Sequence, residues 1–228
     1  MSTNFDDFKN DYSEELDKSI SFSGQDSDFF TERKAHIIVE IAKRHLGETA
    51  NLQVLDLGSG TGVTDSFLTP HMTKLSGAEV SPGVIETAST RNPTVSYRIY
   101  DGLTLPFDNA TFDLVFTICV VHHVPVEKRE LFFSEMRRVT KPGGINIVFE
   151  HNPFNPLTQH VVNNCPFDKD AVLLKPSEVR SRLRKAGLEM AEQAYFLFFP
   201  WRGAFTKKVE NFLGWLPLGG QYFVVARV

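Results

Sequence analysis

Short apolar runs alternate with amphipathic stretches through most of the chain. Each apolar run is typical of a strand buried inside a parallel sheet, and each amphipathic stretch repeats its apolar residues at helical spacing. Seven strands are predicted, at 54–57, 74–80, 95–100, 112–124 (the strand together with its exit), 145–150, 189–199 and 221–227. Helices are predicted between them, at 31–46, 63–68, 83–88, 125–139 and 175–186. This alternation predicts one α/β domain.

The helical periodicity also predicts which side chains are buried. In the helix at 125–139 the inner face is expected to hold Leu131, Phe132, Phe133, Met136 and Val139. The outer face is expected to hold Glu127, Arg129, Glu130 and Arg137. The run Lys-Pro-Gly-Gly at 141–144 should then break the helix and form a turn before the strand at 145–150.

Three stretches do not fit the alternation, and we interpret them as additions to a single domain spanning 1–228. Residues 1–32 are acidic with apolar positions at roughly helical spacing, which indicates an N-terminal arm over the cleft. Residues 151–174 contain three prolines, so no simple helix is expected there, and we assign the stretch to the acceptor side of the site. Residues 201–218 form another addition on that side.

The stretch 201–218 has an amphipathic pattern. One helical face is expected to carry Phe205, Val209, Phe212 and Leu216, and the other largely Lys207, Lys208 and Glu210. The aromatic face could lie on a membrane surface or cover a lipid-like acceptor. Packing on the sheet or in a homodimer contact is the favoured alternative.

The stretch 54–64 combines a strand, a glycine turn and the start of a helix. Asp56 lies within the strand, and Gly58, Gly60 and Gly62 follow at alternate positions. Glycines let the backbone pass close to a ligand, and the free N–H groups at the helix start point into the same space. A dinucleotide site would need glycine at the sixth position counted from Gly58, where Val63 stands. A nucleotide-like ligand is therefore predicted, and a nicotinamide-dependent oxidoreductase is disfavoured.

The pattern Asp-x-Gly-x-Gly-x-Gly resembles the first motif of class I S-adenosylmethionine-dependent methyltransferases. Residues 112–115 and 122–124 resemble the branch that includes ubiquinone and menaquinone methyltransferases, and 138–144 resembles the family's turn before its fifth strand. The resemblance implies a Rossmann-like seven-stranded sheet in the order 3-2-1-4-5-7-6, with strand 7 antiparallel and helices on both faces. It implies S-adenosyl-L-methionine as cofactor, bound by the loop residues Asp56, Gly58, Ser59 and Gly60.

Further cofactor residues are expected at the ends of the next strands. Glu79 lies near the end of the second predicted strand, about twenty residues past the loop, where a carboxylate can accept both hydroxyl protons of a ribose. The resemblance places Val80 against the adenine face. It gives Asp101 and Leu103, in the Asp-Gly-Leu run with Gly102, the contacts to the adenine edge. Backbone carbonyls near Cys119 would receive the cofactor's ammonium group. On the predicted helix at 31–46, Arg33 and Lys34 are candidates for its carboxylate, as is Tyr12 in the arm.

Two histidines are candidate catalytic residues. His122 follows the fourth predicted strand and His151 follows the fifth, so both are expected where the transferable methyl group points. A histidine there can act as a general base, because its ordinary pKa lies near neutral pH. The alternative is structural, with His123 capping the strand and holding the following helix. Glu150 and His151 form a second candidate acid–base pair, with a strand-end cap as the equal alternative.

The composition limits the partners and the compartment. The net charge is −4, so no basic surface for nucleic acid is indicated. The two cysteines, Cys119 and Cys165, form no paired metal pattern and no disulfide framework, and we expect no metal and a cytoplasmic location. The acceptor is expected to be a small molecule or a glycan- or lipid-linked group. A non-catalytic S-adenosylmethionine-binding protein of the same fold is the remaining alternative.

Overall fold

The computed structural model describes residues 24–165, 168, 171–201 and 203–228. Residues 1–23 of the predicted arm, Tyr12 among them, lie outside the described residues. The elements are α2 (Ser27–Leu46), β1 (Gln53–Leu57), α3 (Val63–Leu68), β2 (Lys74–Glu79), α4 (Pro82–Arg91), β3 (Ser96–Ile99), β4 (Phe112–Ile118), η3 (Val121–His123), η4 (Val126–Lys128), α5 (Arg129–Val139), β5 (Thr140–His151), α6 (Pro156–Asn164), α7 (Pro176–Lys185), β6 (Glu189–Phe196), α8 (Ala204–Leu213) and β7 (Gln221–Arg227).

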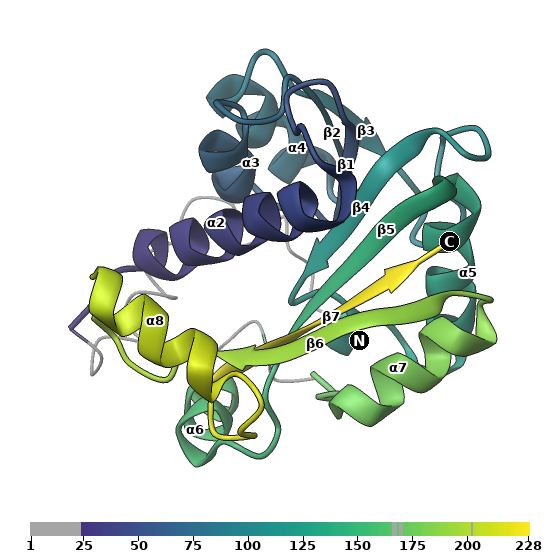
Figure 1. The fold of residues 1–228 in the computed structure, drawn as a ribbon. Helices are drawn as coiled ribbons and strands as arrows, with labels where there is room; N and C mark the ends of the chain where they lie inside the picture. Colours follow the sequence, from purple (N-terminus) through teal and green to yellow (C-terminus); the bar gives the residue numbers. More distant parts are fainter. Residues whose placement is uncertain (1–23, 166–167, 169–170, 202) are drawn as a thin grey trace.

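The strands form one seven-stranded sheet in the order β3-β2-β1-β4-β5-β7-β6, which confirms the predicted topology (Figure 1). β7 runs antiparallel to both of its neighbours, and the remaining pairs are parallel. The strand order reverses between β1 and β4. Ligands of such sheets bind at this reversal, outside the carboxyl ends of the strands.

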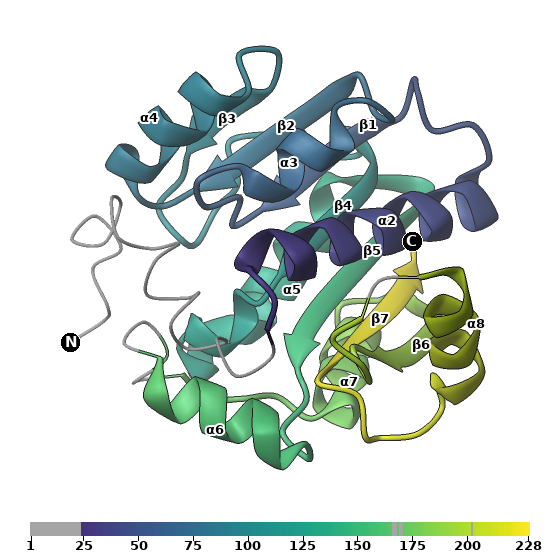
Figure 2. The same cartoon turned by 90° about the vertical axis from the view of Figure 1, so that its left-hand side faces the viewer.

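Alternate residues of the central strands face two apolar clusters, one on each side of the sheet. In β4, Val115 faces a cluster shared with α5 and α7, whereas Leu114 and Phe116 face one shared with α2 and α3. Successive side chains of a strand point to opposite faces, so a strand covered on both sides is apolar throughout. Figure 2 shows α2 and α3 in front of the sheet and α5 and α7 behind it.

Side-chain caps set two helix starts that differ from prediction. α2 begins at Ser27, before the predicted start, because the Asp26 side chain accepts a hydrogen bond from the Phe29 N–H at 2.9 Å. The expectation of no simple helix in 151–174 was wrong for α6. Pro156 occupies the first turn of α6, where its missing N–H costs nothing, and the Asn155 side chain caps it.

The turn predicted at 141–144 lies inside β5 as a bulge. The β4–β5 register passes from Phe112↔Thr140 to Leu114↔Ile145, so the extra residues are accommodated on β5 alone. Gly143 has φ +81°, and its N–H donates to the Val228 carbonyl. The motif therefore bends a continuous strand instead of preceding one.

Two helices bury charged side chains that the periodicity placed outside. In α5, Arg129 is 1% exposed, whereas Leu131 is 43% exposed. In α8, Glu210 is 4% exposed and Phe212 is 77% exposed. Each buried charge has partners on other elements. Arg129 donates to backbone carbonyls, and Glu210 pairs with Arg33 and accepts from the Phe198 N–H.

The apolar face predicted for 201–218 is only partly buried. Val209 and Leu216 are half-buried and Phe212 is exposed, while the side chain of Phe205 lies outside the described part. Trp201, Trp215 and Leu218, which were not predicted on that face, are exposed as well. Among the described residues, no helix combines the length and the apolarity needed to cross a membrane.

Candidate functional site

The glycine loop between β1 and α3 lies at the reversal of strand order. Gly58, Gly60 and Gly62 all have positive φ, at +82°, +52° and +72°. The Gly58 N–H donates to the Ala78 carbonyl at 2.8 Å, which ties the loop to the end of β2. A side-chain carbon at Gly60 would meet nothing within 4 Å. The loop thus presents bare backbone beside open space.

The Glu79 carboxylate lies against this loop. Its Oε2 accepts from the Gly60 N–H at 3.0 Å, and its Oε1 accepts from the N–H groups of Val80 at 2.7 Å and Ser81 at 3.3 Å. Residues 56 to 60 and Glu79, predicted from separate parts of the sequence, are therefore neighbours. The Ser81 side chain caps α4, as it accepts from the Val84 N–H.

The segment after β3 lies beside Val80. The Tyr100 N–H donates to the Glu79 carbonyl, and a side-chain carbon at Gly102 would lie 3.6 Å from the Val80 side chain, which is 44% exposed. The Asp101 carboxylate accepts from the N–H groups of Leu103 and Thr104, both at 2.8 Å, and these bonds lower its pKa. The Leu103 N–H, predicted to meet the adenine ring, is bonded to Asp101 here.

A buried acidic pair lies below the loop. Asp56 is 2% exposed and Asp65 is fully buried. Burial, with the neighbouring Asp65 charge, raises the pKa of Asp56 well above its ordinary range. Burial also raises the pKa of Asp65 to about 6, against the hydrogen bond from the Tyr97 hydroxyl, which lowers it. The Tyr97 hydroxyl joins Asp65 of α3 to β3, and Asp65 carried no recognisable signal in the sequence.

The residues around the loop fit a cofactor with an amino-acid part and a ribose. Asp56 Oδ1 and Ser59 Oγ are buried without a hydrogen-bond partner. Buried polar atoms of folded proteins are normally satisfied, so such atoms beside the exposed backbone of a glycine loop are consistent with a polar ligand. Acceptor oxygens at Asp56 and Glu79 and donors in the loop backbone suit ammonium, hydroxyl and carboxylate groups.

The end of β4 is held in an unusual backbone conformation. Cys119 has φ +55°, and its N–H donates to the Phe149 carbonyl at 2.9 Å. Burial raises the pKa of its thiol to about 12, so the thiol is not a nucleophile at neutral pH. Lys34 of α2 is 9% exposed, and its charge acts on both Cys119 and His151. Of the two cations proposed on this helix, Lys34 faces the site and Arg33 pairs with Glu210.

His122 lies between two carboxylates. Its Nδ1 is 2.6 Å from Glu150 Oε2, and its Nε2 is 3.4 Å from Asp168 Oδ1, without the alignment of a hydrogen bond. Burial alone would lower the pKa of His122, but the two carboxylates outweigh it and raise the pKa to about 9. The side chain is 1% exposed and both nitrogens face carboxylates, so His122 is poorly placed to act as a base on a substrate.

His151 and His123 flank His122. The ring centroid of His122 is 5.2 Å from that of His151 and 4.1 Å from that of His123. His151 Nδ1 lies 3.4 Å from the Gln221 amide nitrogen, and burial lowers the pKa of His151 to about 4. The expected pairing of Glu150 with His151 was wrong. Consecutive residues of β5 point to opposite faces, and Glu150 bonds to His122 and the Val121 N–H.

Arg129 fixes the turn that carries these histidines. Its guanidinium donates to the Val124 carbonyl at 3.0 Å and the Val172 carbonyl at 2.8 Å. The Val172 N–H in turn donates to the His122 carbonyl at 3.0 Å. A residue predicted to be exposed on a helix therefore joins the histidine turn to the segment after Asp168.

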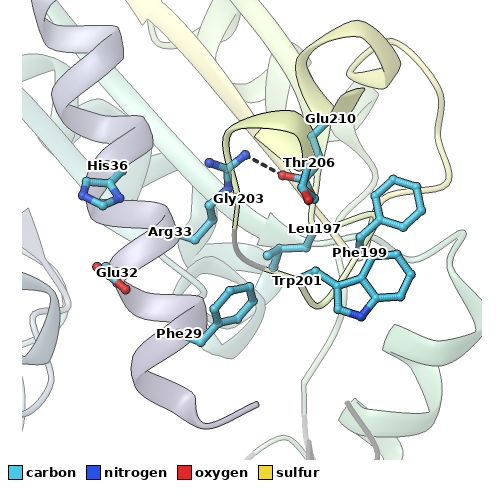
Figure 3. Close-up of a pocket in the computed structure, with 10 residues that line it drawn as sticks. All are labelled: Phe29, Glu32, Arg33, His36, Leu197, Phe199, Trp201, Gly203, Thr206 and Glu210. Carbon is cyan, nitrogen blue, oxygen red and sulfur yellow. Dashed lines mark hydrogen bonds and ion pairs between the residues drawn. The ribbon is translucent and has the colours of Figure 1, made fainter. Parts of the chain in front are cut away.

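A separate cavity of about 290 Å³ opens between α2 and the segment that follows β6 (Figure 3). Its apolar wall consists of Phe29, Leu197 and the stacked rings of Phe199 and Trp201, whose centroids are 5.5 Å apart. The Arg33–Glu210 ion pair crosses one side of it. Phe196, the last residue of β6, and His151 both pair with Gln221, so the cavity begins two strands from His151, roughly 10 Å away.

Comparisons with known proteins agree with this geometry. Residues 55–148 match the model of a family described as a methyltransferase domain. A demethylmenaquinone methyltransferase of Renibacterium salmoninarum is 29% identical over 127 residues, which cover 53% of each chain. A 2-methyl-6-phytyl-1,4-hydroquinone methyltransferase of Synechocystis is 31% identical over 103 residues, covering 43% of this chain and 32% of that protein. The matches thus span about half, or less, of these relatives.

The fold comparison covers the whole chain. A solved S-adenosylmethionine-dependent methyltransferase from Thermotoga maritima superimposes with a TM-score of 0.69 at 22% identity, covering 100% of this chain and 99% of that one. At this identity the similarity shows a shared fold. Together, the matched domain and the fold imply S-adenosylmethionine as the cofactor.

Proposed function

We propose that this chain, which carries a methyltransferase domain of the class I S-adenosylmethionine-dependent type, methylates a small molecule with an apolar ring. The observation that carries the proposal is the contact of the Glu79 carboxylate with the bare glycine loop at the reversal of strand order. S-adenosylmethionine supplies an activated sulfonium methyl group. The chain's own contribution is to bind and align the reactants, exclude water and, where the acceptor requires it, receive a proton.

Each predicted cofactor residue has a role in this proposal. Glu79 accepts from the ribose hydroxyls, and Val80 with Gly102 and Leu103 contacts the base, while Asp101 orders that segment. Asp56, Gly58, Ser59, Gly60 and the backbone at Cys119 hold the amino-acid part. His151 is the candidate to receive a proton, because His122 is enclosed by carboxylates and serves to position the turn.

The acceptor class is supported by the cavity and by the relatives. The printed names of two relatives describe methylation of demethylmenaquinone and of a phytyl hydroquinone. The cavity beside β6 has the aromatic lining that a flat ring requires, and ring stacking contributes about 1 kcal/mol per pair. A lipid-linked acceptor could extend its tail over the exposed side chains of Phe212 and Trp215.

Calorimetry with S-adenosylhomocysteine tests the cofactor part. Wild-type protein should bind it and should not bind NAD. Glu79→Gln should weaken binding at least tenfold, whereas the exposed Glu189→Gln should leave it unchanged. Absence of heat, or equal binding by Glu79→Gln, would refute the site.

Transfer of a labelled methyl group to a panel of hydroquinones, phenols and amines tests the activity. A labelled product from a ring acceptor supports the proposal, and His151→Ala should lower its rate. Cofactor binding without product from any acceptor would favour a non-catalytic binding protein.

A further inference from the structure

Three side chains near the end of β4 have an arrangement that the methyl-transfer proposal does not use. His122, His123 and Asp168 each direct one ligand-type atom to a common point, and these atoms all lie within 4.8 Å of one another. Asp168 Oδ1 is 3.4 Å from Nε2 of His122 and 3.4 Å from Nε2 of His123. Two imidazole nitrogens and one carboxylate oxygen therefore converge.

The spacing matches the coordination of a small divalent ion. Protein ligands bind Zn²⁺ at roughly 2.0 to 2.2 Å, and two ligands of a tetrahedral ion are then about 3.4 Å apart. Both measured separations from Asp168 have this value. An ion could thus bind between Asp168 and each of the two histidines without a change in either separation.

An independent observation concerns the inner nitrogen of His122. Its Nε2 is buried and has no hydrogen-bond partner, although the residue is only 2% exposed. The opposite nitrogen, Nδ1, contacts Glu150 Oε2 at 2.6 Å. A carboxylate on the outer nitrogen is the usual second-shell partner of a metal-binding histidine, because it fixes the tautomer and the ring orientation.

Charge and access are also suitable. Glu150 is fully buried and Asp168 is 11% exposed, so two carboxylates face the histidines in a region largely removed from water. A divalent cation would neutralise both charges. The side chain of His123 is 21% exposed, so one side of the cluster reaches the surface.

We propose that His122, His123 and Asp168 bind a divalent transition-metal ion, with Glu150 as the positioning residue for His122. Two imidazoles and one carboxylate suit Zn²⁺, Co²⁺ or Fe²⁺ rather than Mg²⁺ or Ca²⁺. Three protein ligands leave a coordination position for a water or another oxygen ligand, as in catalytic rather than structural sites. The proposal concerns metal binding and holds whether or not the chain methylates a ring acceptor.

Titration of the full chain with Co²⁺, followed by visible absorption, and with Zn²⁺, followed by calorimetry, tests the site. We expect saturable binding of one ion per chain. His123→Ala and Asp168→Asn, both at partly exposed positions, should each weaken binding at least tenfold. Glu150→Gln should weaken it by about 10- to 100-fold. His71→Ala, at an exposed histidine before β2, is the control and should bind as the wild type does.

Circular dichroism would verify that each variant is folded before the titration is read. Two results would overturn the proposal. One is the absence of saturable binding of either metal by folded wild-type protein. The other is unchanged affinity in the folded His123→Ala and Asp168→Asn variants, which would leave the cluster as a histidine held between two carboxylates.

Discussion

Buried carboxylates occur on both sides of the strand-order reversal. On one side Asp56 and Asp65 lie under the glycine loop, and on the other Glu150 holds His122. A buried carboxyl group either acquires a cationic partner or keeps its proton to higher pH, because burial disfavours the charged form. Glu150 shows the first behaviour and Asp65 the second.

Asp65 gives a prediction about stability and pH. Its pKa is about 6 in the folded protein and about 4 in an unfolded chain. The folded state therefore binds more protons between these values, so the free energy of unfolding falls as pH rises from about 4 to 6 and stays lower above that range. Asp65→Asn lacks this effect. As the pH rises from 4 to 8, the free energy of unfolding of this variant should therefore increase by about 2 to 3 kcal/mol relative to that of wild type, as measured by urea unfolding.

The exposed Asp108→Asn is the control substitution for this comparison. A constant difference between Asp65→Asn and wild type across the same range would show that Asp65 ionises normally in the fold.

The glycine loop and the exit of β4 are packed against each other as elements. A side-chain carbon on Gly58 would lie 2.4 Å from Val120 Cγ2, closer than atoms can approach. The glycine loop and the turn that carries the histidines therefore occupy contiguous space. A disturbance of one should displace the other.

Gly58→Ala tests this coupling. It should lower the free energy of unfolding by about 2 to 4 kcal/mol, from the left-handed backbone and from overpacking against Val120. Gly143→Ala is the control, since Gly143 has φ +81° and nothing within 4 Å, and should cost about 1 to 2 kcal/mol. Val120→Ala should restore part of the loss in the Gly58→Ala background. Equal costs at both glycines, measured by chemical unfolding, would rule out the contact.

Element-level features were predictable where the information is local. The strand, three glycines and helix start at 54–64 needed no knowledge of distant residues, and neither did the apolar run of β4. The burial of Arg129 and Glu210 was not predictable. Periodicity identifies the apolar face of a helix from local sequence. The backbone carbonyl that binds Arg129 and the arginine that pairs with Glu210 lie on other elements. Asp168 was missed for the same reason, since only the folded chain brings it to His122 and His123.

At the scale of the whole molecule, the strand order that the family resemblance implied is confirmed. The antiparallel β7 brings Gln221 between the ends of β5 and β6. The sheet thereby joins the histidine turn and the aromatic cavity along one edge. Cofactor and acceptor are expected to meet at this edge.

Ligand binding should stabilise the entire domain. A ligand that binds only the folded state at 100 times its dissociation constant adds about 2.7 kcal/mol, which is about 5 to 10 °C in Tm for a chain of this size. S-adenosylhomocysteine should therefore raise the Tm of wild-type protein by this amount in differential scanning fluorimetry. Glu79→Gln should show a much smaller rise at the same concentration. An equal rise in both would place the ligand away from Glu79.

The guanidinium of Arg129 binds three backbone carbonyls from two segments that are distant in sequence, those of His122 and Val124 in the histidine turn and that of Val172. Lysine could not replace it, because one ammonium group cannot span the same set of carbonyls in a fixed plane. Natural variation at this position should consequently be narrow. In a functional screen, a substitution of Arg129 should lower activity as a substitution in the active site does, although the side chain contacts no reactant.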